Sequence, residues 1–230
     1  MTIFGPGINI GAGITAEAGT ALVTSGLTVN LDAATYSGAG STWSDISGNS
    51  YTATLYNTPT YSTQNTGYFV FNGTNQYATV SGTPLNTTAY TKQAWFMTTQ
   101  TFDNNLISSD VGGHYMFFNN TNRLYCGHTN WTGFPTTYAS TATFSNNLWY
   151  FATVTFDTTN GMAIYINGSL DSTYTVQKTA PTNGTTNLAC YAAAGNLLRG
   201  RIAQALIYNR ALTAGEVLQN YNATKARFSQ

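Results

Sequence analysis

Charged side chains are scarce in this chain of 230 residues. They make up 7% of it, against roughly 25% in ordinary globular proteins. Eight Lys and Arg residues balance eight Asp and Glu residues, so the net charge is zero. A balanced chain has no field that attracts nucleic acid or an anionic membrane, and we exclude both as partners. Zero net charge also favours self-association, which suits a protein whose task is to assemble.

Cysteines and long apolar runs are also scarce. Cys126 and Cys190 are the only cysteines and do not have the spacing of metal ligands. We expect two buried thiols, with a disulfide as the alternative. No apolar run approaches the roughly 18 residues that a membrane helix requires. The opening sequence MTIFGPGINIG has neither the basic start nor the apolar stretch of a signal peptide. We therefore expect synthesis in a cytoplasm, without a secretion signal.

Short strand-like runs separated by turn residues dominate the chain from Leu27 onward, which indicates an all-β domain. The predicted strands are Thr28–Ala33, Tyr51–Tyr56, Tyr68–Phe71, Gln76–Val80, Gln93–Met97, Tyr115–Phe118, Leu124–Gly127, Trp149–Phe156, Met162–Ile166 and Ile202–Tyr208. Asn-Gly pairs favour the type I′ turns of β-hairpins. Four such pairs lie between the runs: Asn72-Gly73, Asn160-Gly161, Asn167-Gly168 and Asn183-Gly184.

One helix is predicted, over residues 213–226. Thr213 and Glu216 have the spacing of a capping box, and Leu212 and Val217 that of a hydrophobic staple. Val217, Leu218 and Tyr221 then form one apolar stripe, which we expect to cover the sandwich.

Residues 1–26 form a distinct Gly- and Ala-rich segment, in which Ile8, Ile10 and Ile14 are separated by glycines. Such a stretch cannot build a core of its own. We predict an extended arm that anchors the protein on a neighbouring subunit; a loose tail is the alternative. The domain of residues 27–230 is expected to fold without it.

Several motifs, taken in order, resemble those of a known family. They are Leu27–Ala34 (LTVNLDAA), Trp43–Asn49 (WSDISGN), Phe69–Tyr77 (FVFNGTNQY), Ala94–Phe96, Trp149–Ala152, Ile164–Gly168, Gly200–Ile202 and Ile207–Thr213 (IYNRALT). This order resembles the laminin G-like branch of the concanavalin A-like lectin/glucanase superfamily and covers residues 27–228. The resemblance implies a jelly roll of two antiparallel sheets. Within the branch, the Gly-Pro start before the first strand resembles structural proteins of tailed-phage virions.

Catalysis is not expected, because the chain lacks the carboxylates that it would need. The resemblance implies that a glucanase would carry an E-x-D-x-x-E strand, whose carboxyls lie about 5 Å apart. The two glutamates are Glu17, in the arm, and Glu216, in the predicted helix. The six aspartates are scattered, and no serine-elbow, zinc-protease or phosphate-loop motif is present. His114 and His128 are more typical of buried sheet residues than of a catalytic pair.

Two binding sites are predicted, and no cofactor is required. Asp103 and Asp110 are candidate Ca²⁺ ligands, since laminin G-like domains often hold Ca²⁺ at their rim; turn formation is the alternative. The segment His128-Thr129-Asn130-Trp131-Thr132-Gly133-Phe134 offers aromatic rings and an amide in a polar setting. We take Asn130, Trp131, Phe134 and His128 as candidate carbohydrate-binding residues. The alternative is that Trp131 or Phe134 packs inward or against a neighbouring subunit.

The sequence therefore predicts a non-enzymatic virion protein, made in the host cytoplasm and most consistent with capsid decoration. Its expected partners are the major capsid protein, copies of itself and cell-surface glycans. A tail-associated or stand-alone carbohydrate-binding adhesion module is the alternative.

Overall fold

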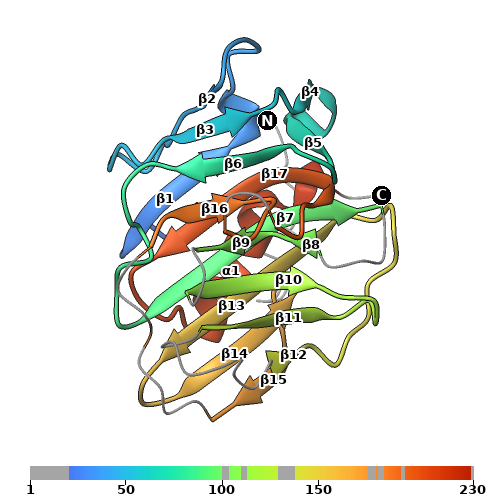
Figure 1. Cartoon of the computed structure of the whole chain (residues 1–230). Helices are drawn as coiled ribbons and strands as arrows, with labels where there is room; N and C mark the ends of the chain where they lie inside the picture. The colour runs from blue at the N-terminus through green and yellow to red at the C-terminus, as the bar shows by residue number, and fades with distance from the viewer. Residues whose placement is uncertain are drawn as a thin grey trace, which may run out of the picture.

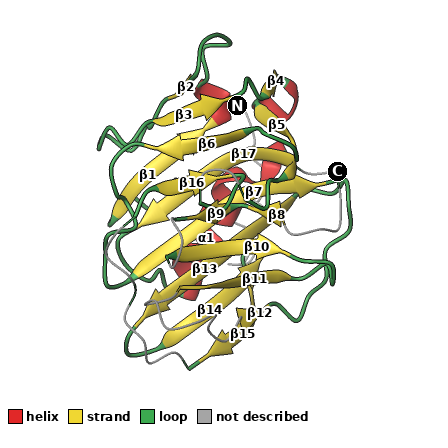
Figure 2. Cartoon of the chain, in the orientation of Figure 1, coloured by secondary structure: helices red, strands yellow, loops and turns green. Residues whose placement is uncertain are grey.

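The computed structural model describes residues 21–99, 104–109, 113–128, 138–175, 180, 184–192 and 195–228. Two antiparallel layers pack face to face, as predicted, and the helix lies behind them (Figures 1 and 2). We call the layer in contact with the helix the back sheet and the other layer the front sheet. Across the described residues, no helix is long and apolar enough to cross a membrane.

The back sheet is a single eight-stranded antiparallel sheet. Its strands run in the order β15 (Ser169–Tyr174), β14 (Gly161–Ile166), β13 (Tyr150–Asp157), β7 (Tyr90–Thr98), β17 (Arg199–Tyr208), β5 (Tyr68–Asn72) and β4 (Thr60–Ser62), with β1 (Leu27–Asp32) also paired to β17. β7 extends three residues N-terminal to the predicted strand, because Thr91 and Lys92 belong to it although they are polar.

The front sheet consists of two groups of strands that meet at residues 104–109. One group is β2 (Thr42–Trp43), β3 (Ala53–Tyr56), β6 (Tyr77–Val80), β16 (Thr186–Leu188) and β9 (Ile107–Ser108); the other is β8 (Asn104–Asn105), β10 (His114–Phe118), β11 (Leu124–His128) and β12 (Tyr138–Ala139). Leu106 N and Ser109 N donate to β10, while Ala189 N donates back to Leu106 O. The two groups therefore form one continuous layer.

The core lies between the layers because alternate residues of each strand point inward. On β7 the inward residues Ala94 and Phe96 join the main cluster, whereas Trp95 and Met97 face the helix side. Trp43, Trp95 and Trp149 are all buried. Cys126 and Cys190 are free and buried.

Helix α1 (Ala214–Thr224) has the predicted capping box, and the short helix η3 (Lys225–Arg227) follows it. The predicted apolar stripe is partly wrong, because Leu218 is 44% exposed. The buried positions of α1 are Val217, Asn220 and Thr224. Asn220 is buried in place of an apolar residue because its amide joins the polar network described below. Two further short helices are η1 (Ala33–Thr35) and η2 (Gln64–Thr66).

The predicted hairpins are confirmed at two Asn-Gly pairs, one of which forms the type I′ turn itself. Asn167 and Gly168 both have positive φ (51° and 80°) between β14 and β15, as a type I′ turn requires. At the first pair, Asn72 is still in β5, and its side chain accepts hydrogen bonds from the amides of the loop that follows. At the second, Asp157 pairs with Gly161 across a longer loop. Asn183 lies outside the described residues.

Candidate functional site

The carboxylates that the structure describes all bind backbone amides. Each accepts at least one backbone N–H, and Asp32 and Glu216 also pair with an arginine. The carboxylates and their partners are Asp32 (Ala34 and Arg227), Asp45 (Asn30, Ser47 and Tyr51), Asp157 (Thr159 and Asn160), Asp171 (Thr141 and Ala142) and Glu216 (Thr213 and Arg210). They hold turns and caps in place. In the described part of the chain, no group of three His, Cys, Asp or Glu side chains is placed to hold a metal ion. The predicted Ca²⁺ ligands Asp103 and Asp110 lie outside it.

His128 is the last residue of β11, and its ring points into the sandwich. The side chain is 5% exposed. Its Nδ1 lies 3.0 Å from the Tyr90 hydroxyl, and its ring packs edge-on against Phe156 at 4.4 Å. A ring held in this way is buried in the core and is not exposed to a sugar at the surface. The other predicted carbohydrate-binding residues, Asn130, Trp131 and Phe134, lie outside the described residues.

A buried lysine lies in the same end of the core. Lys92 is fully buried on β7, where its ammonium donates to the Tyr115 carbonyl at 3.0 Å and lies 5.0 Å from the centre of the Tyr90 ring. Burial lowers the pKa of Lys92 to about 7 and raises the pKa of the Cys126 thiol to about 12. The sequence analysis missed this lysine, although alternation places it on the same face as Tyr90 and Ala94.

The outer surface of β10 and β11 carries a line of rings, which we call the aromatic row: Tyr115, Phe117 and Tyr125. Phe117 stacks on Tyr125, with ring centroids 5.5 Å apart, and lies 5.9 Å from Tyr115. Gly127 makes room for Tyr115, because a Cβ at that position would collide with the tyrosine ring and hydroxyl. The row leads along β11 towards His128 and the predicted carbohydrate-binding segment. It is the aromatic surface nearest to that segment in sequence.

Polar side chains lie buried beside the aromatic row, on the same outward side of the sheet. Ser108 donates to the Cys190 carbonyl at 2.5 Å, and Asn105 donates from its backbone N–H to the Asn196 carbonyl at 3.1 Å. The chain after β16 therefore packs over this part of the sheet. Within the described residues, Asn105 Oδ1, Asn187 Nδ2 and the Tyr115 hydroxyl have no hydrogen-bond partner. This neutral polar centre was not predicted, because its residues lie on strands of two or three residues.

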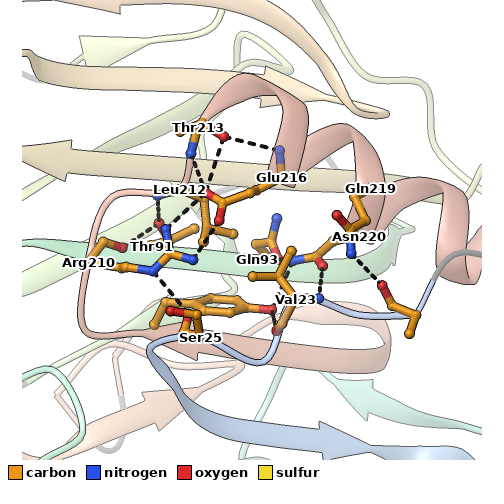
Figure 3. A network of polar contacts seen from close by, with 12 residues as sticks. Val23, Ser25, Thr91, Gln93, Arg210, Leu212, Thr213, Glu216, Gln219 and Asn220 are labelled. Atoms are coloured by element: carbon orange, nitrogen blue, oxygen red, sulfur yellow. Dashed lines mark hydrogen bonds and ion pairs between the residues drawn. The ribbon is translucent and has the colours of Figure 1, made fainter.

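Residues 21–25 lie against the back of the molecule (Figure 3). We call them the latch segment. Side chains of β17, of α1 and of the loop between them bind its backbone. Asn220 Oδ1 accepts from Val23 N at 2.8 Å, the Tyr208 hydroxyl donates to Val23 O at 3.0 Å, Gln219 donates to Ala21 O, and Arg210 in the loop donates to Ser25 O. The Val23 side chain is buried with Leu212 and Val217. Part of the predicted arm thus packs on the domain, while Ile8, Ile10 and Ile14 lie outside the described residues.

A family model described as "Concanavalin A-like lectin/glucanases superfamily" matches residues 72–218. Among solved structures, a Trypanosoma rangeli sialidase superposes with a TM-score of 0.70 at 16% identity, covering 94% of this chain and 36% of the sialidase. The Botulinum neurotoxin type G receptor-binding domain gives 0.68 at 19%, covering 86% and 51%. The binding domain of Paraclostridial Mosquitocidal Protein 1 gives 0.71 at 18%, covering 86% and 52%.

These similarities establish the fold but not the activity. The chain spans about a third of the length of the sialidase and about half of the length of each of the two binding-domain structures. No curated protein matches the sequence.

Proposed function

Because the chain belongs to the concanavalin A-like lectin/glucanases superfamily, we propose that it is a non-enzymatic, glycan-binding structural protein of a phage virion, most consistent with capsid decoration. The observation that carries this proposal is that two features lie on opposite sides of the sandwich. The aromatic row lies on the outward side of the front sheet, where Phe117 and Tyr125 are partly exposed and Tyr115 is buried, and the latch segment lies against β17 and α1 behind the back sheet. We propose that an arm continuing from the latch segment attaches the back of the domain to the particle, so that the front sheet faces outward.

The uses of the carboxylates support a non-enzymatic role. Glycoside hydrolysis by the common mechanisms needs two carboxyl groups free to exchange protons or attack the sugar. Asp32, Asp45, Asp157, Asp171 and Glu216 are instead bound to backbone amides. We propose that the resemblance to the sialidase concerns the fold and does not extend to its activity.

Glycan binding is supported by the chemistry of the front sheet. An aromatic ring packs well on the apolar face of a sugar, and a neutral amide or hydroxyl suits the sugar's hydroxyl groups. Phe117 and Tyr125 of the aromatic row supply partly exposed rings, and the predicted residues Asn130, Trp131 and Phe134 follow directly after β11. We propose that the row and this segment form one site. Receptor-binding and binding domains among the similar folds are consistent with this role.

The proposed attachment uses Ile8, Ile10 and Ile14. In an extended segment these side chains would present an apolar edge, and glycine allows the backbone to lie close to a partner surface. Burial of three isoleucines would contribute several kcal/mol before the cost of ordering the arm, so many copies on a repeating surface would be needed. We propose the major capsid protein as that surface. A tail-associated or stand-alone adhesion module remains the second candidate, since the same front sheet would serve it.

Two variants separate attachment from recognition. Deletion of residues 2–20, which keeps the latch segment, is expected to abolish incorporation into particles formed in infected cells while leaving a folded domain. Trp131→Ala is expected to leave incorporation intact and to reduce binding of the particles to cells. Normal incorporation of the deleted chain would contradict the anchor. Release of reducing sugar or sialic acid by the purified protein above background would contradict the non-enzymatic role.

A further inference from the structure

A second aromatic surface lies at the other end of the front sheet. Tyr56 on β3 stacks on Tyr77 on the neighbouring strand β6, with ring centroids 4.6 Å apart and planes within 12°. Both rings point outward, because Leu55 and Ala78 beside them point into the core. Tyr56 is 41% exposed although it is large and aromatic. We call the two rings the tyrosine platform.

The turn that follows Tyr56 has an unusual backbone. Asn57 and Thr58 both have positive φ, 58° and 51°. This conformation is uncommon outside glycine and is an outlier for a β-branched residue such as Thr58. The Gln76 amide holds it by donating to the carbonyl oxygens of both residues, at 3.0 and 2.9 Å, and Asn57 Nδ2 donates to Asn75 O at 2.6 Å. Such conformations persist where the surroundings enforce them, and they are concentrated at binding sites.

The polar atoms around the platform are neutral and available. Within the described residues, the hydroxyl groups of Tyr56 and Tyr77 and the Asn57 Oδ1 atom have no hydrogen-bond partner, and Thr54 is exposed next to them on β3. An exposed ring bordered by neutral donors and acceptors matches a pyranose, which has one apolar face and a rim of hydroxyl groups. We propose that the tyrosine platform binds a sugar unit of a neutral glycan.

This proposal rests on the proposed glycan-binding function and specifies its ligand. β6 and β10 are separated by three strand spacings, through β16 and β9, which amounts to about 14 Å at the usual spacing. That separation exceeds one sugar ring, and the chain after β16 packs over the strands between the two surfaces, so a glycan that passes over this segment would contact the platform and the aromatic row with different units. The ligand is therefore an internal stretch of an oligosaccharide. Affinity is expected to rise with chain length until both surfaces are occupied, because the second contact becomes intramolecular.

The test uses the full chain and native gels that contain a soluble neutral polysaccharide: laminarin, dextran or galactomannan. At least one is expected to retard the protein. Tyr56→Ala is expected to weaken that binding about ten-fold, which is the loss of one aromatic contact, while Tyr56→Phe retains the ring and most of the binding. Leu170→Ala is the control, because Leu170 is 56% exposed on β15, in the back sheet. Fragments of the bound polysaccharide, from one unit to six, then test the length dependence.

The outcomes separate the platform from the proposed function. If Trp131→Ala weakens binding and Tyr56→Ala does not, the glycan-binding function stands and the platform is refuted. If the protein binds only sialylated glycans on an array, the function stands and the neutral ligand is refuted. If Tyr56→Ala converts an oligomer into monomers, Tyr56 is a contact between copies and the proposal fails. If no glycan of either kind binds, both the platform and the proposed glycan binding are refuted.

Discussion

Replacing Lys92 with methionine is expected to stabilise the protein at neutral and acidic pH. The lysine is fully buried, and burial lowers its pKa from 10.5 to about 7. Keeping the ammonium charged inside the fold therefore costs about 5 kcal/mol, at 1.36 kcal/mol per unit of pKa. Methionine fills a similar volume without the charge. It loses the hydrogen bond to the Tyr115 carbonyl, worth about 1 kcal/mol. We expect a net gain of about 3–4 kcal/mol at pH 6.

The stability that Lys92→Met gains over the wild type must decrease as the pH rises. Below pH 7 the lysine is protonated in both the folded and the unfolded protein, so the full cost is present. Between pH 7 and 10.5 the unfolded protein holds a proton that the folded protein has released, so the stability of the wild type rises with pH. The stability of Lys92→Met lacks this rise. The advantage of the variant should therefore shrink from pH 7 and be lost by about pH 10.5.

Equilibrium unfolding in urea at pH 6, 7, 8, 9 and 10 measures the difference between the two proteins. Titratable groups that both proteins share contribute equally to the two free energies of unfolding, so their effects cancel in the difference. Lys225→Met provides the control, because Lys225 is exposed and its ammonium donates to Asn222; its effect should stay within about 0.5 kcal/mol. A variant that is less stable than wild type at pH 6, or an advantage that does not change with pH, would refute this account of the buried lysine.

Three further predictions concern the latch segment and α1. Asn220→Ala removes the partner of Val23 N, Gln93 Oε1 and the Tyr208 hydroxyl and should cost about 2–4 kcal/mol in urea unfolding; an effect no larger than that of Asn222→Ala would contradict the network. A chain that begins at Gly26 should melt about 5–10 °C below one that begins at Ala21, because Val23 loses its buried site; equal melting temperatures would show that the latch segment is dispensable. Glu216→Gln should cost about 1–2 kcal/mol at pH 7. Hydrogen bonding to Arg210 holds the pKa of Glu216 at about 2, so this difference should vanish as the pH falls from 4.5 to 2, and melting curves at pH 2 and 6 measure it.

The sequence predicted the elements whose signal is local. Apolar alternation and turn residues located the long strands except β15, which is six residues long and mostly polar, and the Thr213–Glu216 spacing located the start of α1. Residues 104–109 were missed because they form strands of only two residues each, and one of their neighbours, β16, comes from a distant part of the chain. β16 itself has only three residues, which is too short for a periodic pattern to emerge.

The site was less predictable than the fold. The aromatic row follows from alternation on β10 and β11, but nothing local shows which rings of a half-buried strand face outward. The buried Lys92 was missed because the predicted strand began at Gln93, and a lysine is almost never fully buried. The latch segment was assigned to the arm because small residues give no apolar pattern, although Val23 fills a site made by β17 and α1.

The position of β17 determines when the protein can complete its fold. This strand pairs with β7 on one side and with both β1 and β5 on the other. It comes from residues 199–208, near the C-terminal end of the sequence. During synthesis, β1 therefore remains without its sheet partner until β17 emerges from the ribosome, more than 160 residues later. Pairing over such separations is slow, and it leaves strand edges exposed to other chains until the last strand arrives.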